Sequence, residues 1–233
     1  MLKIALFADG ANKDQMLKRY HEGMVKGFTT NPTLMAKAGL RDYAGFAREV
    51  LEVIKDRPIS FEVFSDDFSE MERQAGLIQS WGSNVNVKIP ITNTRGEPSL
   101  GLIRRLLDRK VRLNITAVFT DEQLKRLRET IRPADDVIVS IFAGRIADTG
   151  TDPMPIMKKA VKDFAGHSGT KILWASPREA LNIYQADACG CHIITCTDDL
   201  LSKLPLHEKT LEEFSLDTVK MFHRDAAQAG FAL

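Results

Sequence analysis

Short apolar runs typical of strands alternate along the chain with amphipathic segments typical of helices. The strand-like runs cover residues 3–8, 25–29, 59–64, 85–90, 111–116, 137–142, 171–175 and 192–196. Apolar residues recur at helical spacing in segments such as 42–55, 66–80, 98–108, 120–130, 153–164 and 177–187. Strands that alternate with helices predict a parallel sheet, and eight strands are enough to close it. We therefore expect one α/β domain over residues 1–233, a single (β/α)8 TIM barrel with an extra C-terminal helix at 211–227.

Helix-start residues support this division. Ser65-Asp66 precedes one helical segment and Thr120-Asp121-Glu122 opens another. The helix at 211–227 has two possible places, against the barrel or against a neighbouring subunit.

Polar side chains share one face of three consecutive strand-like runs, whereas the opposite face is apolar. In a closed barrel alternate side chains point into the barrel, and enzymes of this architecture place their sites at the carboxyl ends of the strands. The polar face consists of Ser60, Glu62, Phe64, Asn84, Asn86, Lys88, Arg112, Asn114 and Thr116. We expect this face to line the barrel and to carry the site.

Lys88 is the first candidate for chemistry. A lysine in an isolated strand is more often a surface residue whose charged end reaches solvent. On an inward face, however, burial favours the neutral amine, which can attack a carbonyl carbon. The protonated imine that results stabilises a carbanion or enamine, as is needed to break or make a carbon–carbon bond beside a carbonyl.

Such a lysine needs a general acid or base. Asp9 follows the first strand-like run and Glu62 lies in the third. Either residue alone is weak support, and Asp9 could equally be a helix cap. Neutral hydrogen-bonding groups suited to sugar hydroxyls come from Asn31, Asn114 and Thr116.

An anion site is predicted after strands six and seven. Arg145, Ser176 and Arg178 follow these strands, and late loops of such barrels commonly bind phosphate. Pro177 could begin a helix and leave nearby amides free. Arg178 could also be an exposed arginine at a helix start.

Composition excludes several other classes. With 32 basic and 31 acidic residues, the chain has no net field that would attract nucleic acid or an anionic membrane. No apolar run approaches the length of a membrane span, and no secretory signal is recognisable, so we expect a cytoplasmic protein. Cys189, Cys191 and Cys196 are interpreted as apolar fillers rather than as a disulfide framework or a metal site.

Five strings in order resemble transaldolases. They are Gly27-Phe28-Thr29-Thr30-Asn31-Pro32-Thr33, Val85-Asn86-Val87-Lys88-Ile89-Pro90-Ile91-Thr92, Leu113-Asn114-Ile115-Thr116, Ser140-Ile141-Phe142-Ala143-Gly144-Arg145-Ile146 and Ala175-Ser176-Pro177-Arg178. The resemblance covers almost the whole chain, and its length is similar to the short branch that includes the fructose-6-phosphate aldolases.

The resemblance implies roles for these residues. Lys88 would form the Schiff base, Asp9 and Glu62 would act as acid and base, and Glu62 and Thr116 would position the catalytic water. The substrate-binding residues would be Thr29, Asn31, Asn114, Ser140, Phe142, Arg145, Ser176 and Arg178. It further implies sugar phosphate substrates, the pentose phosphate pathway or a specialised sugar pathway, no metal or organic cofactor, and a homo-oligomer, either a pentamer or a decamer.

Two positions bear on the reaction type. The aldolases of this branch typically have glutamine where this chain has Glu62 and tyrosine where it has Phe142, so the resemblance favours transfer of dihydroxyacetone over its release. A lyase and a sugar-phosphate binding or scaffold protein are the alternatives.

Three features depart from the family pattern. Pro177 stands where phenylalanine is usual, Trp174 is bulky near the end of strand seven, and the 93–98 loop looks longer than usual. Arg95 in that loop is either a solvent-exposed residue or a contact for an atypical anionic substrate.

Overall fold

Eight parallel strands form a closed barrel in which each strand pairs with its neighbours in chain order. The computed structural model describes residues 2–231. The strands are β1 (Ala5–Asp9), β2 (Gly27–Thr29), β3 (Ile59–Glu62), β4 (Val85–Pro90), β5 (Leu113–Val118), β6 (Val137–Ile141), β7 (Thr170–Trp174) and β8 (Ile193–Cys196). The predicted TIM barrel is therefore confirmed.

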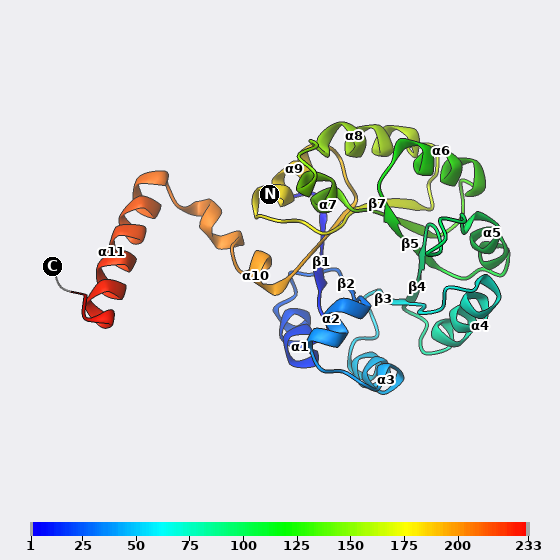
Figure 1. Cartoon of the computed structure of the whole chain (residues 1–233), viewed down its shortest axis with the longest axis horizontal. Helices are drawn as coiled ribbons and strands as arrows, with labels where there is room; N and C mark the ends of the chain where they lie inside the picture. Colours follow the sequence, from blue (N-terminus) through cyan, green and yellow to red (C-terminus); the bar gives the residue numbers. More distant parts are fainter. Residues whose placement is uncertain (1, 232–233) are drawn as a thin grey trace.

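Helices surround the barrel as an outer ring (Figure 1). In chain order the helices of the described residues, inside and outside this ring, are α1 (Lys13–Glu22), α2 (Pro32–Lys37), α3 (Tyr43–Val53), α4 (Phe68–Gln79), α5 (Leu100–Asp108), α6 (Asp121–Thr130), α7 (Ala143–Asp148), α8 (Met154–Asp163), α9 (Leu181–Ala188), α10 (Asp198–Leu201), the 3-10 helix η1 (Leu204–Glu208) and α11 (Leu211–Ala229). The short helices α2, α7 and α10 follow β2, β6 and β8 directly, so they border the carboxyl ends of these strands.

Several predicted boundaries were wrong by a few residues. The fourth helix starts after Asp67, which caps it, rather than after Ser65-Asp66, whereas Thr120 caps α6 as predicted through a capping box with Gln123. The fifth strand covers 113–118 instead of 111–116, and it contains a register shift between Ile115 and Val118.

The barrel interior contains a polar layer and a separate apolar cluster. Asn114 and Thr116 on β5 are buried and point inward, as the alternation predicts. On β1, β6 and β8 the cavity-lining residues Asp9, Ser140 and Thr195 each lie two residues after a member of the apolar cluster. Its buried members are Phe7, Ile138, Leu173, Ala175 and Ile193.

Close packing inside the barrel explains Gly27. A Cβ atom at this position would collide with the ring of Phe7 from the neighbouring strand β1. Phe64, by contrast, does not join the inward face, because β3 ends at Glu62. Its side chain is 54% exposed and contacts the ring of Tyr43.

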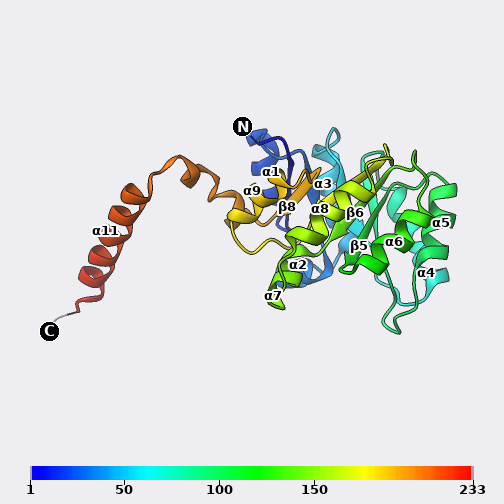
Figure 2. The ribbon, with the colours of Figure 1, turned by 90° about the horizontal axis from the view of Figure 1, so that it is seen from above.

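Helix α11 projects away from the barrel at the end of the chain (Figures 1 and 2). None of its residues is buried, and Leu211, Val219 and Phe222 are among its exposed large apolar side chains. The helix has a capping box between Thr210 and Glu213 and ends at a left-handed Gly230. The extra C-terminal helix is confirmed, and it does not pack on its own barrel.

Candidate active site

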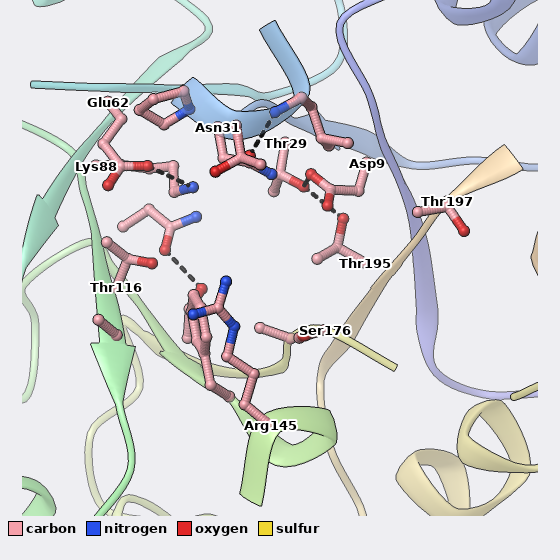
Figure 3. Close-up of a pocket in the computed structure, with 18 of the residues that line it drawn as sticks. Asp9, Thr29, Asn31, Glu62, Lys88, Thr116, Arg145, Ser176, Thr195 and Thr197 are labelled. Carbon is pink, nitrogen blue, oxygen red and sulfur yellow. Dashed lines mark hydrogen bonds and ion pairs between the residues drawn. The ribbon is translucent and has the colours of Figure 1, made fainter. Parts of the chain in front are cut away.

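A cavity of about 490 Å³ opens at the carboxyl ends of the strands (Figure 3). All of the side chains to which the resemblance assigns a catalytic or substrate-binding role line it. They are Asp9, Thr29, Asn31, Glu62, Lys88, Asn114, Thr116, Ser140, Phe142, Arg145, Ser176 and Arg178. The fold thus brings together residues from seven of the strands or the loops that follow them.

Lys88 lies on the wall of this cavity and is only 6% exposed. Its Nζ donates a hydrogen bond of 2.8 Å to the backbone oxygen of Thr30 and lies 3.0 Å from Oε2 of Glu62. The interpretation of Lys88 as a surface lysine is therefore wrong. Glu62 is placed beside Lys88 because the two residues are register partners on the adjacent strands β3 and β4.

Asp9 ends β1 and faces the same cavity. Its Oδ1 accepts a hydrogen bond of 2.7 Å from the Thr29 hydroxyl, and that hydroxyl lies 2.6 Å from the hydroxyl of Thr195. Burial raises the pKa of Asp9, although the charge of Lys88 and the hydrogen bond from Thr29 oppose this change. Asp9 is not a helix cap, since Asn12 caps α1.

A chain of hydrogen bonds fixes the amide of Asn114. The hydroxyl of Ser140 donates to Oδ1 of Asn114 at 2.6 Å, and Nδ2 of Asn114 donates to the hydroxyl of Ser60 at 3.1 Å. All three side chains are buried. The amide is therefore held in one orientation before any substrate enters, which is the preorganisation that a binding site needs.

Backbone irregularities shape the cavity at two points. Thr116 is buried and is followed by Ala117, which has a positive φ of 58°, at the register shift in β5. Asn31 caps α2 by accepting a hydrogen bond of 2.9 Å from the backbone N–H of Leu34. The positive φ of Ala117 is a strained conformation for a non-glycine residue, which persists only where the surrounding structure holds it.

The opposite side of the cavity is formed by α7 and the loop after β7. Ser176 has a positive φ of 60°, and a Cβ atom on Gly144 would collide with its backbone oxygen. Glycine at this position therefore lets the helix and the loop approach closely. Arg145 is exposed, extends over the ring of Phe142 at 5.4 Å and forms no ion pair with the rest of residues 2–231.

Arg178 differs from Arg145 in its surroundings. Its guanidinium group forms an ion pair with Asp148 at the end of α7. Pro177 does not start a helix, because α9 begins only at Leu181, so this prediction was wrong. The amide of Arg178 is not free either, since its N–H donates to Oδ1 of Asn182 at 2.8 Å.

The other departures from the family pattern lie outside the cavity. Trp174 is fully buried in the large core between the barrel and its helices. Arg95 forms ion pairs with Asp66 and Glu97, which tie the 93–98 loop to the loop after β3. Neither side chain lines the cavity, so the interpretation of Arg95 as a substrate contact is wrong.

Several lining residues were not predicted from the sequence. Lys37 on α2 and Thr197 after β8 border the cavity, and Thr195 projects into it from β8. Thr195 could have been found, because it is the polar residue that alternates with Ile194 and Cys196 in the last strand. The backbone oxygen of Thr30, which accepts a hydrogen bond from Lys88, could not have been found, because no pattern of side chains indicates it.

Potential metal ligands, cysteines and helices also occur in the described part of the chain. Within residues 2–231 there is no group of three or more His, Cys, Asp or Glu side chains that could hold a metal ion. Cys189, Cys191 and Cys196 are buried free thiols. None of the helices in this part of the chain is both long and apolar enough to span a membrane.

Solved structures with similar folds include distant proteins. A 3-hexulose-6-phosphate synthase matches with a TM-score of 0.59 and 12% identity over 84% of this chain and 90% of its own. A 2,3-dimethylmalate lyase matches with a TM-score of 0.57 and 12% identity over 98% of this chain and 84% of its own. At this identity the likeness concerns the barrel fold alone.

Relatives of similar length are much closer in sequence. A protein of Thermoanaerobacter sp. (strain X514) named "Probable transaldolase" is 33% identical over 91% of this chain and 95% of its own length. One of Dehalococcoides mccartyi with the same name is 34% identical over 88% of this chain and 92% of its own length. The family model described as Transaldolase/Fructose-6-phosphate aldolase matches residues 6–233. This chain therefore belongs to the transaldolase/fructose-6-phosphate aldolase family.

Proposed function

We propose that the protein is a transaldolase that transfers a dihydroxyacetone unit between ketose and aldose phosphates through a Schiff base on Lys88. The observation that carries this proposal is the burial of the Lys88 amine beside Glu62, in a cavity that also contains Asp9. Fructose 6-phosphate or sedoheptulose 7-phosphate would be the donor. Erythrose 4-phosphate or glyceraldehyde 3-phosphate would be the acceptor.

In the first half of the reaction, the neutral amine of Lys88 attacks the C2 carbonyl of the ketose. The carbinolamine loses water to give a protonated imine. Asp9 takes the proton of the C4 hydroxyl, the C3–C4 bond breaks, and its electron pair is accepted by the imine as an enamine. An aldose phosphate leaves, and three carbons stay attached to Lys88. The lysine supplies the electron sink, so this mechanism needs no metal or organic cofactor.

The second half reverses these steps with a different aldehyde. The enamine attacks the acceptor carbonyl, and Asp9 returns its proton to the new C4 hydroxyl. Glu62 and Thr116 position the water that hydrolyses the imine and frees Lys88. Burial raises the pKa of Asp9, which makes its carboxylate a stronger base toward the proton of the C4 hydroxyl.

Substrate recognition is assigned to the remaining lining residues. The amides of Asn31 and Asn114 and the hydroxyl of Ser140 are suited to the hydroxyl groups of the three-carbon unit. Arg145 and Ser176 are suited to the phosphate at the far end of the sugar, since Arg145 forms no ion pair with another residue of the range 2–231. Arg178 lines the same region, but Asp148 already occupies its guanidinium group.

Reduction with borohydride tests the covalent step. In the presence of fructose 6-phosphate, borohydride should fix a three-carbon label on Lys88, which peptide mass spectrometry can locate. Lys171, a strand lysine that is exposed, serves as the internal control and should stay unlabelled. The absence of label on Lys88 would contradict the proposed mechanism, for the transferase and for a lyase alike.

Release of dihydroxyacetone separates transfer from lysis. Glu62 and Phe142 occupy the two positions at which transfer is favoured by the resemblance, and both line the cavity. We expect little free dihydroxyacetone when fructose 6-phosphate is supplied without an acceptor, and rapid turnover when erythrose 4-phosphate is added. Equal turnover with and without the acceptor would assign the protein to the lyases of the family.

We also propose that the protein is a homo-oligomer in which a neighbouring copy covers α11. This helix exposes Leu216, Val219 and Phe222 and has no buried residue, although both of its ends are capped. Large exposed apolar patches mark interaction sites. Sedimentation velocity should give a pentamer or decamer for the native chain and a smaller species for Val219→Asp, whereas Lys220→Asp on the same helix should sediment as the native chain does. A monomeric native chain would contradict the proposal.

A further inference from the structure

Strand β3 extends beyond the end of its neighbour β2. The two strands pair through Phe28 with Ile59 and Thr29 with Ser60. The N–H groups of Phe28 and Thr30 donate to the backbone oxygens of Pro58 and Ser60 at 2.8 and 3.1 Å. Because hydrogen bonds of a parallel pair recur every two residues, the next ones would join Glu62 to residues 30 and 32.

Neither of those hydrogen bonds forms. Residue 32 is a proline, which has no N–H group to donate to the backbone oxygen of Glu62. The backbone oxygen of Thr30, which would accept from the Glu62 N–H, instead accepts from Nζ of Lys88 at 2.8 Å. Both backbone groups of Glu62 therefore need another partner, since an unpaired buried N–H is costly.

The hydroxyl group of Tyr43 on α3 supplies the partner for both backbone groups of Glu62. The backbone N–H of Glu62 donates to it at 2.6 Å, and the hydroxyl donates to the backbone oxygen of Glu62 at 3.2 Å. Burial raises the pKa of Tyr43, so the phenol keeps the proton that the second hydrogen bond requires. One side chain thus replaces the missing end of β2.

Packing holds the Tyr43 ring in this position. Its ring contacts those of Phe61, Phe64 and Trp81 edge-on, with centroid distances of 5.9, 4.5 and 5.5 Å. Edge-to-face pairs at such distances are favourable. The hydroxyl group is therefore fixed from behind rather than free to rotate away with its side chain.

We propose that Tyr43 is a positioning residue for the Lys88–Glu62 pair. Its hydroxyl completes the sheet at Glu62, which leaves the backbone oxygen of Thr30 available to hold the lysine. The same two hydrogen bonds fix the backbone of Glu62, and therefore the position from which its carboxylate contacts Lys88. This inference rests on the proposed Schiff-base function.

Removal of the hydroxyl should create competition for the Thr30 oxygen. In Tyr43→Phe the Glu62 N–H has no partner unless it turns to that oxygen, as in an ordinary parallel pair. Lys88 then loses one of its two hydrogen-bonding partners, and the strand end that carries Glu62 shifts. The binding residues on the other side of the cavity are unaffected.

Steady-state kinetics and borohydride trapping test this role. For Tyr43→Phe we expect kcat to fall about tenfold, equivalent to one hydrogen bond of ordinary strength. We expect KM to stay within about twofold, and the trapping rate on Lys88 to fall with kcat. Tyr184→Phe is the matched control, because it removes a tyrosine hydroxyl on α9, away from the cavity, and should leave all three quantities unchanged.

Phe64→Leu separates positioning from packing. It weakens the aromatic contact of Tyr43 but keeps the hydroxyl, so kcat should stay within about twofold while the melting temperature falls. Equal losses of kcat in Phe64→Leu and Tyr43→Phe would overturn the positioning role in favour of a structural one. A Tyr43→Phe chain that does not fold, beside a folded Tyr184→Phe chain, would overturn it as well.

The two proposals fail in different ways. If the native chain acquires no label on Lys88, the Schiff-base function fails and the role of Tyr43 fails with it. If the native chain is labelled and Tyr43→Phe is labelled equally fast, only the role of Tyr43 is overturned.

Discussion

The two sides of the candidate active-site cavity are held by the fold to different degrees. On the side of β1 to β4, Lys88 is buried and bound by both Thr30 and Glu62, and Asp9 is bound by Thr29. On the side of β6 and β7, Arg145 is exposed and stands over an aromatic ring without an ion pair inside the described chain. The first side is fixed in advance, and the second is open to adjustment.

This difference matches the demands of the proposed reaction. Covalent and proton-transfer steps require atoms to be held within fractions of an ångström, which burial and mutual hydrogen bonds provide. Recognition of a phosphate by an exposed arginine tolerates more freedom, because its attraction acts over a longer distance. The buried side should therefore control kcat, whereas the open side should control KM and the choice of acceptor.

Lys88→Met should have the largest effect. Loss of the nucleophile removes the covalent route, so kcat/KM should fall by about 10⁴-fold or more, with no borohydride label. Lys171→Met replaces a strand lysine that does not line this cavity and should retain activity. Appreciable turnover by Lys88→Met in a coupled assay would show that the buried side does not carry the chemistry.

Asp9→Asn should reduce kcat by about 10²- to 10⁴-fold, as expected for loss of a general acid–base group. The same change should stabilise the protein at neutral pH. The pKa of Asp9 in the folded state is raised above its usual value of 3.8. The unfolded chain therefore ionises first, and the folded chain loses stability as the pH rises from 3.8 to the raised pKa.

Asparagine stays neutral and avoids this loss. The melting temperature of Asp9→Asn should therefore exceed that of the native chain at pH 7, by about 2–4 °C for each kcal/mol recovered. The two should converge below the usual pKa of 3.8, where Asp9 is protonated in both states. A lower melting temperature than the native chain at pH 7 would contradict the cost assigned to the buried carboxylate.

Arg145→Ala should act through substrate binding. We expect kcat/KM for a phosphorylated ketose to fall about 10- to 100-fold, the value of one or two hydrogen bonds to a charged group. The loss should lie mainly in KM, and an unphosphorylated ketose should be affected little. If kcat fell while KM stayed constant, Arg145 would act on the chemical step, which contradicts the proposal that the open side of the cavity controls binding and the buried side controls kcat.

Arg178→Ala should have the smallest effect, about threefold or less, because Asp148 already binds this guanidinium group at the surface. Asp148→Ala releases Arg178 and should lower KM for a phosphorylated ketose a few-fold. The double variant Asp148→Ala/Arg178→Ala should lose this gain. A large loss in Arg178→Ala alone would show that Arg178 leaves Asp148 when substrate binds.

The order of strands and the contents of the cavity could be predicted from the sequence because both follow from local patterns. Alternation with a period of two placed Lys88, Asn114 and Thr116 on one face, and parallel strands bring their carboxyl ends to one edge. The ordered strings supplied the specific residues. Helix ends were less certain, since Asp66 and Asp67 are both acceptable caps, and in the structure Asp67 caps α4 while the Asp66 carboxylate accepts hydrogen bonds from Thr94.

The tertiary structure alone decided which partners the charged groups obtained. Arg145 and Arg178 are similar in the sequence, but Asp148, 30 residues from Arg178, engages one and not the other. A separate apolar cluster forms inside the barrel because Phe7, Ile138 and Leu173 meet there from strands that are distant in the chain.

Lys88 is the clearest case of this division. The sequence by itself determined the candidate residue and the strand that carries it, because the ordered family strings and the alternation of polar and apolar residues both mark Lys88. Only the tertiary structure decided how its amine is held. The amine donates to the backbone oxygen of Thr30, and the Tyr43 hydroxyl replaces that oxygen as the partner of the Glu62 N–H. Both groups lie on other elements, and hydrogen bonds between backbone and side chain across such distances produce no periodic pattern in the sequence.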